Sequence, residues 1–281
     1  MNSPAITLGI ALEQATRTLD ATSPTARVDA ETLLMHLSGI TRASLITRAG
    51  ELLDARQHEA FQQLVARREA GEPVAYLTGT REFWSLSLKV TPAVLIPRPE
   101  TELLVECALA RISRDAENTI TDLGTGSGAI ALALAHERPR CRIIATDTSV
   151  EALEVARDNA YRLGIRNIEF HLSDWFEAIV NKQFDFIVSN PPYVRADDPH
   201  LTQGDARFEP QPALVGGVDG LDAIRRIAAG ARAQLRAGGW LLLEHGYDQD
   251  FDVAEILREA GFHELMSHRD LAGHVRVTAA R

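Results

Sequence analysis

The chain has 281 residues, 45% hydrophobic and 24% charged, which is the composition of a globular protein with one large or two modest domains. Its net charge of −10 argues against sequence-independent binding to DNA, which depends on neutralising phosphates, and is compatible with a basic protein partner. Two cysteines without Cys-x-x-Cys spacing indicate neither a disulfide framework nor a zinc site, so we expect no metal. No apolar run reaches membrane-spanning length and residues 1–20 carry no basic leader. We therefore expect a cytoplasmic protein with no membrane contact.

The first part of the chain shows only helical periodicity. Over residues 5–71, Gly39 is expected to end one helix and Asp54 to begin another that runs to Ala70. The pattern predicts a small bundle of four or five helices, which we place at residues 1–71. The stretch 72–97 changes to β-rich sequence and is expected to be a linker with a β-hairpin.

The remainder, residues 98–281, reads as a main domain of α/β class. A helix is expected from Glu100 to Arg111, and from Thr119 strands and helices are expected to alternate four times. A helix at 221–235, a strand at 240–244, a helix at 251–260 and two final strands complete seven strands. Right-handed crossovers place the loops that follow the parallel strands on one rim of the sheet.

A glycine-rich turn lies between the first of these strands and its helix. Asp122 enters the turn, and Gly124, Gly126 and Gly128 follow with G-x-G-x-G spacing. This spacing is neither the G-x-G-x-x-G of dinucleotide sites nor the G-K-[ST] ending of a P-loop. Because the turn has an acid and no lysine, it favours a ligand with a cationic part over a triphosphate.

Further ligand-type residues follow the next two strands. Asp147 lies 19 residues beyond Gly128, about where an acid bonds ribose hydroxyls in nucleotide-binding sheets. Asp174 could accept a hydrogen bond from an adenine amino group, and Trp175 could cover the adenine face. Taken singly, an acid here is often a helix N-cap and a tryptophan is often core. Their order along four strand ends indicates a ligand site.

The fourth strand, 184–189, runs directly into Asn190-Pro191-Pro192-Tyr193. Prolines cannot extend a central strand because they offer no N–H to the ladder. The backbone must leave the sheet at Asn190, where an amide oxygen and a stiff carbonyl can accept both hydrogens of a planar NH2 group. Tyr193 can lie on the face of that group. On its own the motif is as readily a turn that ends a strand.

These motifs together resemble the release factor glutamine methyltransferases, which use S-adenosyl-L-methionine (SAM). The resemblance runs from about residue 72 to the C-terminus. It rests on the glycine turn, on Asn190-Pro191-Pro192-Tyr193, and on four further motifs: Tyr76-Leu-Thr-Gly79-Thr-Arg81-Glu82-Phe83-Trp84, Leu95-Ile-Pro97-Arg98-Pro99-Glu100-Thr101-Glu102, Phe208-Glu209-Pro210 and Ala213-Leu-Val-Gly216-Gly217-Val-Asp219-Gly220-Leu221.

The resemblance implies a seven-stranded Rossmann-like methyltransferase domain, its last strand inserted antiparallel, joined by the hairpin linker to the N-terminal helical bundle. It implies methylation of the side-chain amide nitrogen (N5) of the glutamine in the Gly-Gly-Gln motif of class I peptide chain release factors. The cofactor would be SAM and the product S-adenosyl-L-homocysteine, without a metal, and the bundle would recognise the substrate. The implied catalytic residues are Asn190, Pro191 and Tyr193. The implied cofactor-binding residues are Gly124, Thr125, Gly126, Ser127, Gly128, Asp147, Asp174, Trp175 and Asn190. The implied substrate-binding residues are Asn190, Pro191, Pro192, Tyr193 and Arg98.

Two other functions share parts of this pattern. A nucleic-acid adenine N6 or cytosine amino methyltransferase would use the same clamp, that is, the Asn190 amide oxygen and the neighbouring carbonyl as acceptors, because its target is also a planar NH2 group. It would need a basic recognition surface, yet residues 1–85 hold 8 basic and 10 acidic residues, and residues 86–281 hold 21 and 29. A SAM-binding regulatory module without catalysis would not need the intact Asn-Pro-Pro-Tyr motif. We therefore expect no direct nucleic-acid substrate.

Overall fold

The chain divides into two compact units in the computed structural model, which describes residues 6–281. One unit contains the residues up to Gly79 together with Gln203–Phe208, and the other contains Thr80–Thr202 and Glu209–Arg281. The helical domain expected at residues 1–71 thus begins with five residues outside the described part of the chain. No helix within residues 6–281 has the length and apolar character needed to cross a membrane.

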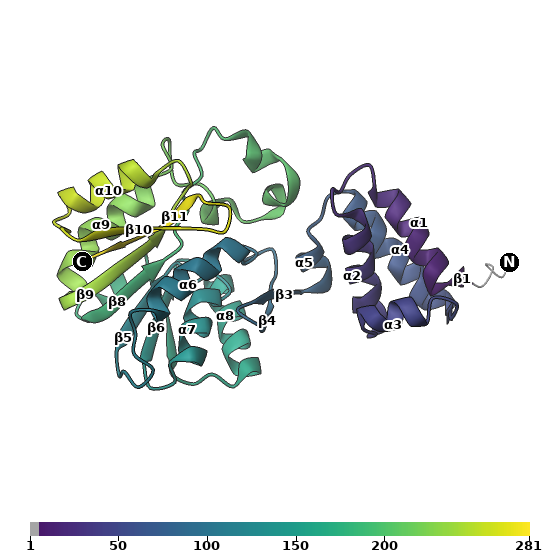
Figure 1. Ribbon diagram of the computed structural model, residues 1–281, viewed down its shortest axis with the longest axis horizontal. Helices are drawn as coiled ribbons and strands as arrows, with labels where there is room; N and C mark the ends of the chain where they lie inside the picture. Colours follow the sequence, from purple (N-terminus) through teal and green to yellow (C-terminus); the bar gives the residue numbers. More distant parts are fainter. Residues whose placement is uncertain (1–5) are drawn as a thin grey trace. The chain divides into compact units, whose positions relative to one another are not determined.

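Within its described residues, the helical unit is a bundle of five helices (Figure 1) with one small strand pair. Its helices are α1 Leu8–Leu19, α2 Ala26–Ser38, α3 Arg42–Thr47, α4 Ala55–Glu69 and α5 Val74–Thr78; its antiparallel strands are β1 Ile6–Thr7 and β2 Leu52–Leu53. As the sequence predicts, Asp54 caps α4 by accepting from the N–H of Gln57 at 2.8 Å, and Gly39 ends α2 in the left-handed region. Apolar side chains from all five helices form the core of this unit.

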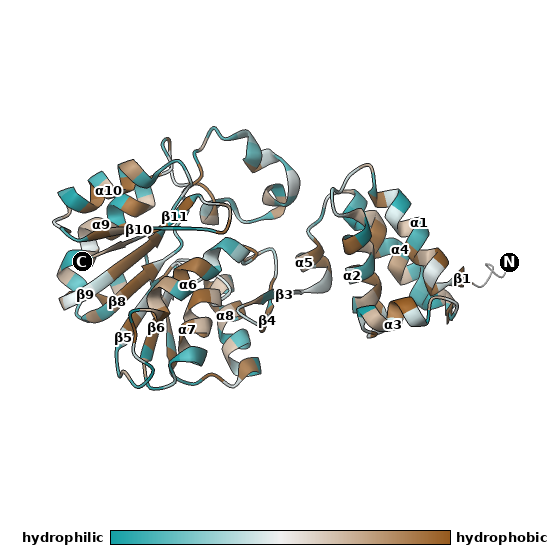
Figure 2. Cartoon of the chain, in the orientation of Figure 1, coloured by the Kyte–Doolittle hydropathy of each residue, from teal (hydrophilic) through white to brown (hydrophobic). Residues whose placement is uncertain are grey.

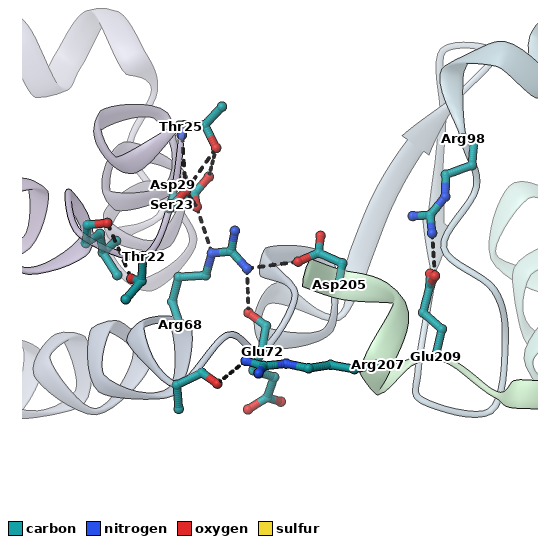
Figure 3. A network of polar contacts seen from close by, with 12 residues as sticks. Thr22, Ser23, Thr25, Asp29, Arg68, Glu72, Arg98, Asp205, Arg207 and Glu209 are labelled. Atoms are coloured by element: carbon teal, nitrogen blue, oxygen red, sulfur yellow. Dashed lines mark hydrogen bonds and ion pairs between the residues drawn. The ribbon is translucent and has the colours of Figure 1, made fainter. Parts of the chain in front are cut away.

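Arg68, near the end of α4, connects three segments of the helical unit (Figure 3). Its Nε donates to Asp29 Oδ2 in α2 at 2.7 Å, and its Nη1 donates to Asp205 Oδ1 at 3.0 Å. Asp29 also accepts from the hydroxyls of Ser23 at 2.8 Å and Thr25 at 2.9 Å. The buried carboxylate of Asp29 therefore accepts hydrogen bonds at both of its oxygens.

A second arginine holds the same distant segment. Arg207 Nη2 donates to the carbonyl oxygen of Ala70 at 2.6 Å, just after α4. Gly71 makes room for it, because a Cβ there would lie 1.7 Å from Arg207 Nη2. Residues 203–208, which are remote in sequence, are thus bound to the helical unit by two side chains.

The other unit begins with the hairpin that the sequence predicts. Strands β3 Thr80–Phe83 and β4 Leu86–Lys89 pair antiparallel, and Trp84 and Ser85 make the turn with φ of 52° and 59°. These left-handed angles are unusual for residues with side chains. The turn is fastened at Trp84, whose backbone N–H donates to Glu102 Oε1 at 2.8 Å.

A seven-stranded mixed sheet forms the centre of this unit, and the predicted fold class is confirmed. Its strands are β5 Thr119–Leu123, β6 Arg142–Asp147, β7 Ile168–Leu172, β8 Phe184–Ser189, β9 Leu235–Glu244, β10 Leu265–Arg269 and β11 Val275–Ala280. Their order is β10-β11-β9-β8-β5-β6-β7. Strands β5 to β9 are parallel, and β11 is inserted antiparallel between β9 and β10.

Helices cover both faces of this sheet (Figure 1). One apolar core lies under α6 Glu102–Leu109, α7 Ala129–Glu137 and α8 Val150–Leu163, and the other lies under α9 Asp222–Gln234 and α10 Asp250–Glu259. The strands are correspondingly hydrophobic (Figure 2), as expected for strands buried on both faces. The loops at the carboxyl ends of the parallel strands are left as the place for a ligand site.

The expected strand–helix alternation fails after the third and fourth strands. Short 3₁₀ segments follow β7 and β8 instead of α-helices: η2 Glu177–Ile179 after β7, and η3 Pro199–Thr202, η4 Gly204–Phe208 and η5 Gln211–Ala213 after β8. Prolines that recur through residues 191–212 remove the N–H donors that a continuous helix needs. The segment after β8 is consequently a long loop, part of which belongs to the helical unit.

We predict that Arg68→Ala destabilises the helical unit by about 3 kcal/mol, because breaking a buried ion pair leaves an uncompensated charge on Asp29. Hydrogen exchange should speed up at residues 203–208, which lose the contact with Asp205. The matched control is Arg67→Ala, whose guanidinium pairs with Glu72 in a more exposed position and should cost at most about 1 kcal/mol. Thermal unfolding that is equally affected in both variants would contradict this role of Arg68.

Candidate active site

A cavity of about 360 Å³ opens at the carboxyl ends of the parallel strands. The strand ends contribute Gly124, Gly126, Asp147, Trp175 and Asn190 to its wall. The remaining wall includes apolar residues that precede α6 or follow η4: Val94, Leu95, Pro210, Pro212 and Ala213. The structure therefore brings together residues that the sequence analysis places at four different strand ends.

The glycine turn is held closely against the end of β6. The N–H groups of Gly124 and Thr125 both donate to the carbonyl oxygen of Thr146, at 2.9 and 2.8 Å. Gly124, Gly126 and Gly128 have φ of 73°, 55° and 86°, in the left-handed region that glycine adopts without strain. A Cβ at Gly124 would point to within 3.6 Å of Trp175 Cζ3, so the missing side chain leaves room in the cavity.

Two of the predicted cofactor residues stabilise this turn through hydrogen bonds in the protein interior. Thr125 and Ser127 are buried and do not line the cavity. Thr125 Oγ1 donates to Asp122 Oδ2 at 2.6 Å, and Ser127 accepts through its carbonyl from Asn159 Nδ2 at 2.9 Å. Burial raises the pKa of Asp122 to about 7, against the hydrogen bond from Thr125 that lowers it. Gly124 and Gly126 thus face the cavity, Thr125 and Ser127 brace the loop, and Gly128 packs against Leu132 and Ala156 without lining the cavity.

Asp147 lies at the end of β6, in the wall of the cavity. Its Oδ2 accepts from the N–H of Gly126 and its Oδ1 from the N–H of Ser149, each at 2.9 Å. Burial raises the pKa of this carboxyl, while the backbone N–H groups lower it. Because each carboxylate oxygen can accept more than one hydrogen bond, Asp147 can brace the glycine turn and still accept from a ligand hydroxyl.

The two residues predicted to hold an adenine lie differently. Trp175 lines the cavity and has φ of 50°, a conformation braced by the hydroxyl of Ser173, which donates to the Trp175 carbonyl at 3.0 Å. Asp174 does not line the cavity, and its carboxylate pairs with Arg226 at 2.7 Å on the surface. The structure therefore brings Trp175, and not Asp174, to the cavity wall.

Asn190 is the first residue after β8 and faces the cavity. Its side-chain Nδ2 donates to Thr101 Oγ1 at 3.1 Å, in the 3₁₀ turn η1 Pro99–Thr101 that precedes α6. The neighbouring Ser189 is fixed to β5, since its hydroxyl donates to the Leu123 carbonyl at 2.7 Å. Asn190 is thus held on a rigid strand end with its amide orientation defined.

The rest of the motif is packed against residues that follow in the chain. Pro192 also lines the cavity, and the hydroxyl of Tyr193 donates to Glu244 Oε1 at 3.2 Å, at the end of β9. Burial is the main cause of the raised pKa of Tyr193, so the phenol stays protonated. A Cβ at Gly216 would lie 2.5 Å from the Pro192 carbonyl oxygen, and one at Gly220 would lie 2.3 Å from that of Tyr193. These two glycines therefore let the loop pass directly behind the motif.

Arg98, like Pro191 and Tyr193, is a predicted substrate residue that does not line the cavity. Its guanidinium pairs with the buried carboxylate of Glu209 (Figure 3). The other oxygen of Glu209 accepts from the backbone N–H of Ile96 at 2.9 Å. Arg98 and Glu209 thereby join the segment before α6 to the loop after η4, both of which contribute to the cavity wall.

Sequence reasoning did not identify Thr101 and Glu244, which contact Asn190 and Tyr193. Glu244 is an acid at the carboxyl end of the strand beside β8, a position that could have identified it. Thr101 carries no such signal, because its contact joins residues 89 positions apart. Within residues 6–281 no group of histidines, cysteines and acids has an arrangement suited to a metal ion.

The mixed sheet with its parallel strands β5 to β9, the glycine turn, the acid at the end of β6 and the Asn-Pro-Pro-Tyr motif at the end of β8 define a SAM-dependent methyltransferase of the Rossmann-like class. Two family models match the chain: "PrmC N-terminal domain" over residues 11–79 and "Methyltransferase small domain" over residues 99–206.

Similar proteins identify the family within this class of methyltransferases. The chain is 52% identical to a release factor glutamine methyltransferase of Xylella fastidiosa over 93% of this chain and 95% of that protein. It is 49% identical to the Escherichia coli K12 protein of that name over 92% of this chain and 93% of that protein. A solved methyltransferase of Pyrococcus furiosus shares the fold, with a TM-score of 0.54 at 18% identity over 78% of this chain and 95% of that one. The chain belongs to the release factor glutamine methyltransferase family.

We predict that Asp147→Ala weakens SAM binding by about 1–3 kcal/mol, which corresponds to a roughly 5- to 150-fold higher Kd. The substitution removes a carboxylate from the cavity wall and also releases the N–H of Gly126. Asp174→Ala is the comparison, because that carboxylate pairs with Arg226 and should affect SAM binding less. If calorimetry finds the same Kd for SAM in Asp147→Ala and in the wild type, Asp147 does not bind SAM and acts only as a helix cap.

Proposed function

We propose that this protein transfers a methyl group from SAM to the side-chain amide nitrogen, N5, of the glutamine in the Gly-Gly-Gln motif of class I peptide chain release factors. Asn190 carries the proposal: it lines the cavity and offers an amide oxygen at the end of a central strand. Membership of the family supports the choice of a release factor glutamine as substrate.

The cavity fits SAM in size and in chemistry. Two glycines line it without side chains, the carboxylate of Asp147 reaches its wall, and Trp175 offers an aromatic face. Gly124–Gly128 would hold the methionine part, Asp147 the ribose and Trp175 the adenine, with Thr125, Ser127 and Gly128 acting through the shape of the turn. Bound there, SAM supplies an electrophilic methyl group on a sulfonium.

The reaction places a specific demand on the protein. An amide nitrogen is a poor nucleophile because its lone pair is conjugated with the carbonyl. Acceptance of both N–H hydrogens by Asn190 Oδ1 and the Pro191 carbonyl raises electron density on nitrogen and accommodates the positive charge that develops there. Tyr193 packs on the amide plane, and Pro192 completes the wall. Alignment of the nitrogen with the methyl group of SAM supplies a large part of the reduction in the activation barrier.

We predict that Asn190→Ala lowers kcat for release factor methylation by roughly 100- to 1,000-fold, as expected when one preorganised hydrogen-bond partner of the transition state is lost. SAM binding should fall much less, and circular dichroism should show an intact fold. The matched control is Asn167→Ala, since Asn167 donates to three backbone carbonyls at the opposite edge of the sheet. That variant should cost stability and leave kcat near wild type. Near-normal kcat in Asn190→Ala would remove Asn190 from the proposed chemistry.

The helical unit is proposed to recognise the release factor. A clamp for one amide group distinguishes few substrates, so selection must come from more extended contacts. The helical unit packs around a core of its own, and none of its described residues, 6–79 and 203–208, lines the cavity. Recognition by this unit would confine methylation to a glutamine presented on the correct protein.

We predict that a short Gly-Gly-Gln peptide is methylated with a kcat/KM at least roughly tenfold lower than that of the whole factor, because it lacks those contacts. Labelled methyl should appear on the whole factor and disappear when its glutamine is changed to alanine. DNA and RNA should accept none. Equal kcat/KM for the peptide and the whole factor would show that the helical unit does not recognise the release factor. Labelled methyl in DNA or RNA would overturn the proposed substrate.

A further inference from the structure

Residues 209–217, called the strap below, form part of the cavity wall and are held at both ends. Three residues of the strap line the cavity: Pro210, Pro212 and Ala213. Beyond them, the strap pairs with the chain that follows the Asn-Pro-Pro-Tyr motif. The N–H of Val194 donates to the Leu214 carbonyl, and the N–H of Gly216 donates to the Val194 carbonyl, each at 2.9 Å. Backbone hydrogen bonds therefore fix the later end of the strap.

The first residue of the strap, Glu209, is held through its side chain. Glu209 is 4% exposed. Its Oε1 accepts from the backbone N–H of Ile96 at 2.9 Å, and its Oε2 accepts from the guanidinium of Arg98 (Figure 3). Leu95, the residue before Ile96, lines the cavity, and so does Pro210, the residue after Glu209. A single carboxylate thus joins two segments of the wall, each within one residue of the cavity lining.

The strap is stiff enough for the position of Glu209 to matter further along it. Pro210 and Pro212 have φ angles fixed by their rings. The N–H of Ala213 donates to the Pro210 carbonyl at 2.9 Å, which closes the 3₁₀ turn η5. A stiff segment that is held at both ends keeps its middle in place. Release of Glu209 would therefore displace the residues of the strap that line the cavity.

We propose that Glu209 is a positioning residue that holds the strap against the cavity and so slows the release of SAM. The proposal rests on the proposed function, in which SAM occupies this cavity. Glu209 does not line the cavity, so its effect on SAM passes through the strap. Arg98 has a defined part in this arrangement, because a buried carboxylate persists as an anion only where a cation or several donors compensate it.

The test measures the release of labelled SAM from the protein after a chase with unlabelled SAM, with no release factor present. Glu209→Gln keeps the shape of the side chain and an acceptor for Ile96. Its NH2 group then faces the guanidinium of Arg98, and two donors do not bond. We expect SAM release to become roughly 10-fold faster and the Kd to rise by the same factor, since such changes appear mainly in the dissociation rate. In methylation assays the KM for SAM should rise by more than kcat falls.

Variants of Arg98 keep the proposal testable if Glu209→Gln folds poorly. The side chain of Arg98 is 34% exposed, so Arg98→Ala removes less buried structure. It should also speed the release of SAM, and Arg98→Lys, which keeps the charge, should recover part of the loss. In the double variant Arg98→Ala/Glu209→Gln the two effects should not add, because both substitutions break the same interaction.

The matched control is Asp185→Asn. Asp185 also accepts from a backbone N–H, that of Thr119 at 2.7 Å, and from a guanidinium, that of Arg236 at 2.6 Å. It lies at the start of β8, whereas the cavity opens at the carboxyl ends of the strands. This variant should lower the melting temperature and leave the rate of SAM release unchanged.

The outcomes separate this proposal from the proposed function. Wild-type SAM release in folded Glu209→Gln and Arg98→Ala would overturn the role of Glu209. Additive effects in the double variant, or equally fast release in Asp185→Asn, would overturn it as well. If these variants behave as expected but the wild type transfers no methyl group to a release factor, the proposed substrate fails and the role of Glu209 stands. A wild-type protein that binds no SAM would overturn both.

Discussion

The structure depends on one constraint, which is that a planar NH2 group has two hydrogens and needs two acceptors in its own plane. A strand that continued beyond Ser189 would use its carbonyls in the ladder. Two prolines after Asn190 prevent this and direct the chain out of the sheet at the rim where the cavity opens. The neighbouring features follow from this exit. Gly216 and Gly220 leave space behind the motif, and Ser189 fixes the strand end to β5.

Polar groups that do not line the cavity hold the Asn-Pro-Pro-Tyr motif in place. Asn190 Nδ2 donates to Thr101 Oγ1, and the hydroxyl of Tyr193 donates to Glu244 Oε1. These two bonds hold both ends of the motif against neighbouring segments of the chain. A cost in stability from burying Glu244 is consistent with its raised pKa. Asp147 is held in a similar way, because its Oδ2 accepts from Gly126 in the glycine turn and its Oδ1 from Ser149, and both oxygens keep capacity for a ligand.

Local patterns made much of the fold predictable. The glycine turn, the hairpin, the capped helices and the seven strands are each encoded within a few residues, and the expected mixed sheet is confirmed. What the sequence could not reveal depends on contacts between distant residues. Residues 203–208 belong to the helical unit because Asp205 and Arg207 bind residues near the end of α4, and no local pattern predicts this. Thr101 likewise acquires its role only when α6 packs beside β8.

The most direct measurement is a crystal structure of this protein with S-adenosyl-L-homocysteine and a release factor whose Gly-Gly-Gln glutamine is intact. The account predicts the glutamine Nε2 within about 2.7–3.2 Å of both Asn190 Oδ1 and the Pro191 carbonyl oxygen, with Asn190 Nδ2 still bonded to Thr101. A complex in which the glutamine carbonyl oxygen faces Asn190, or in which the amide nitrogen binds elsewhere, would contradict it.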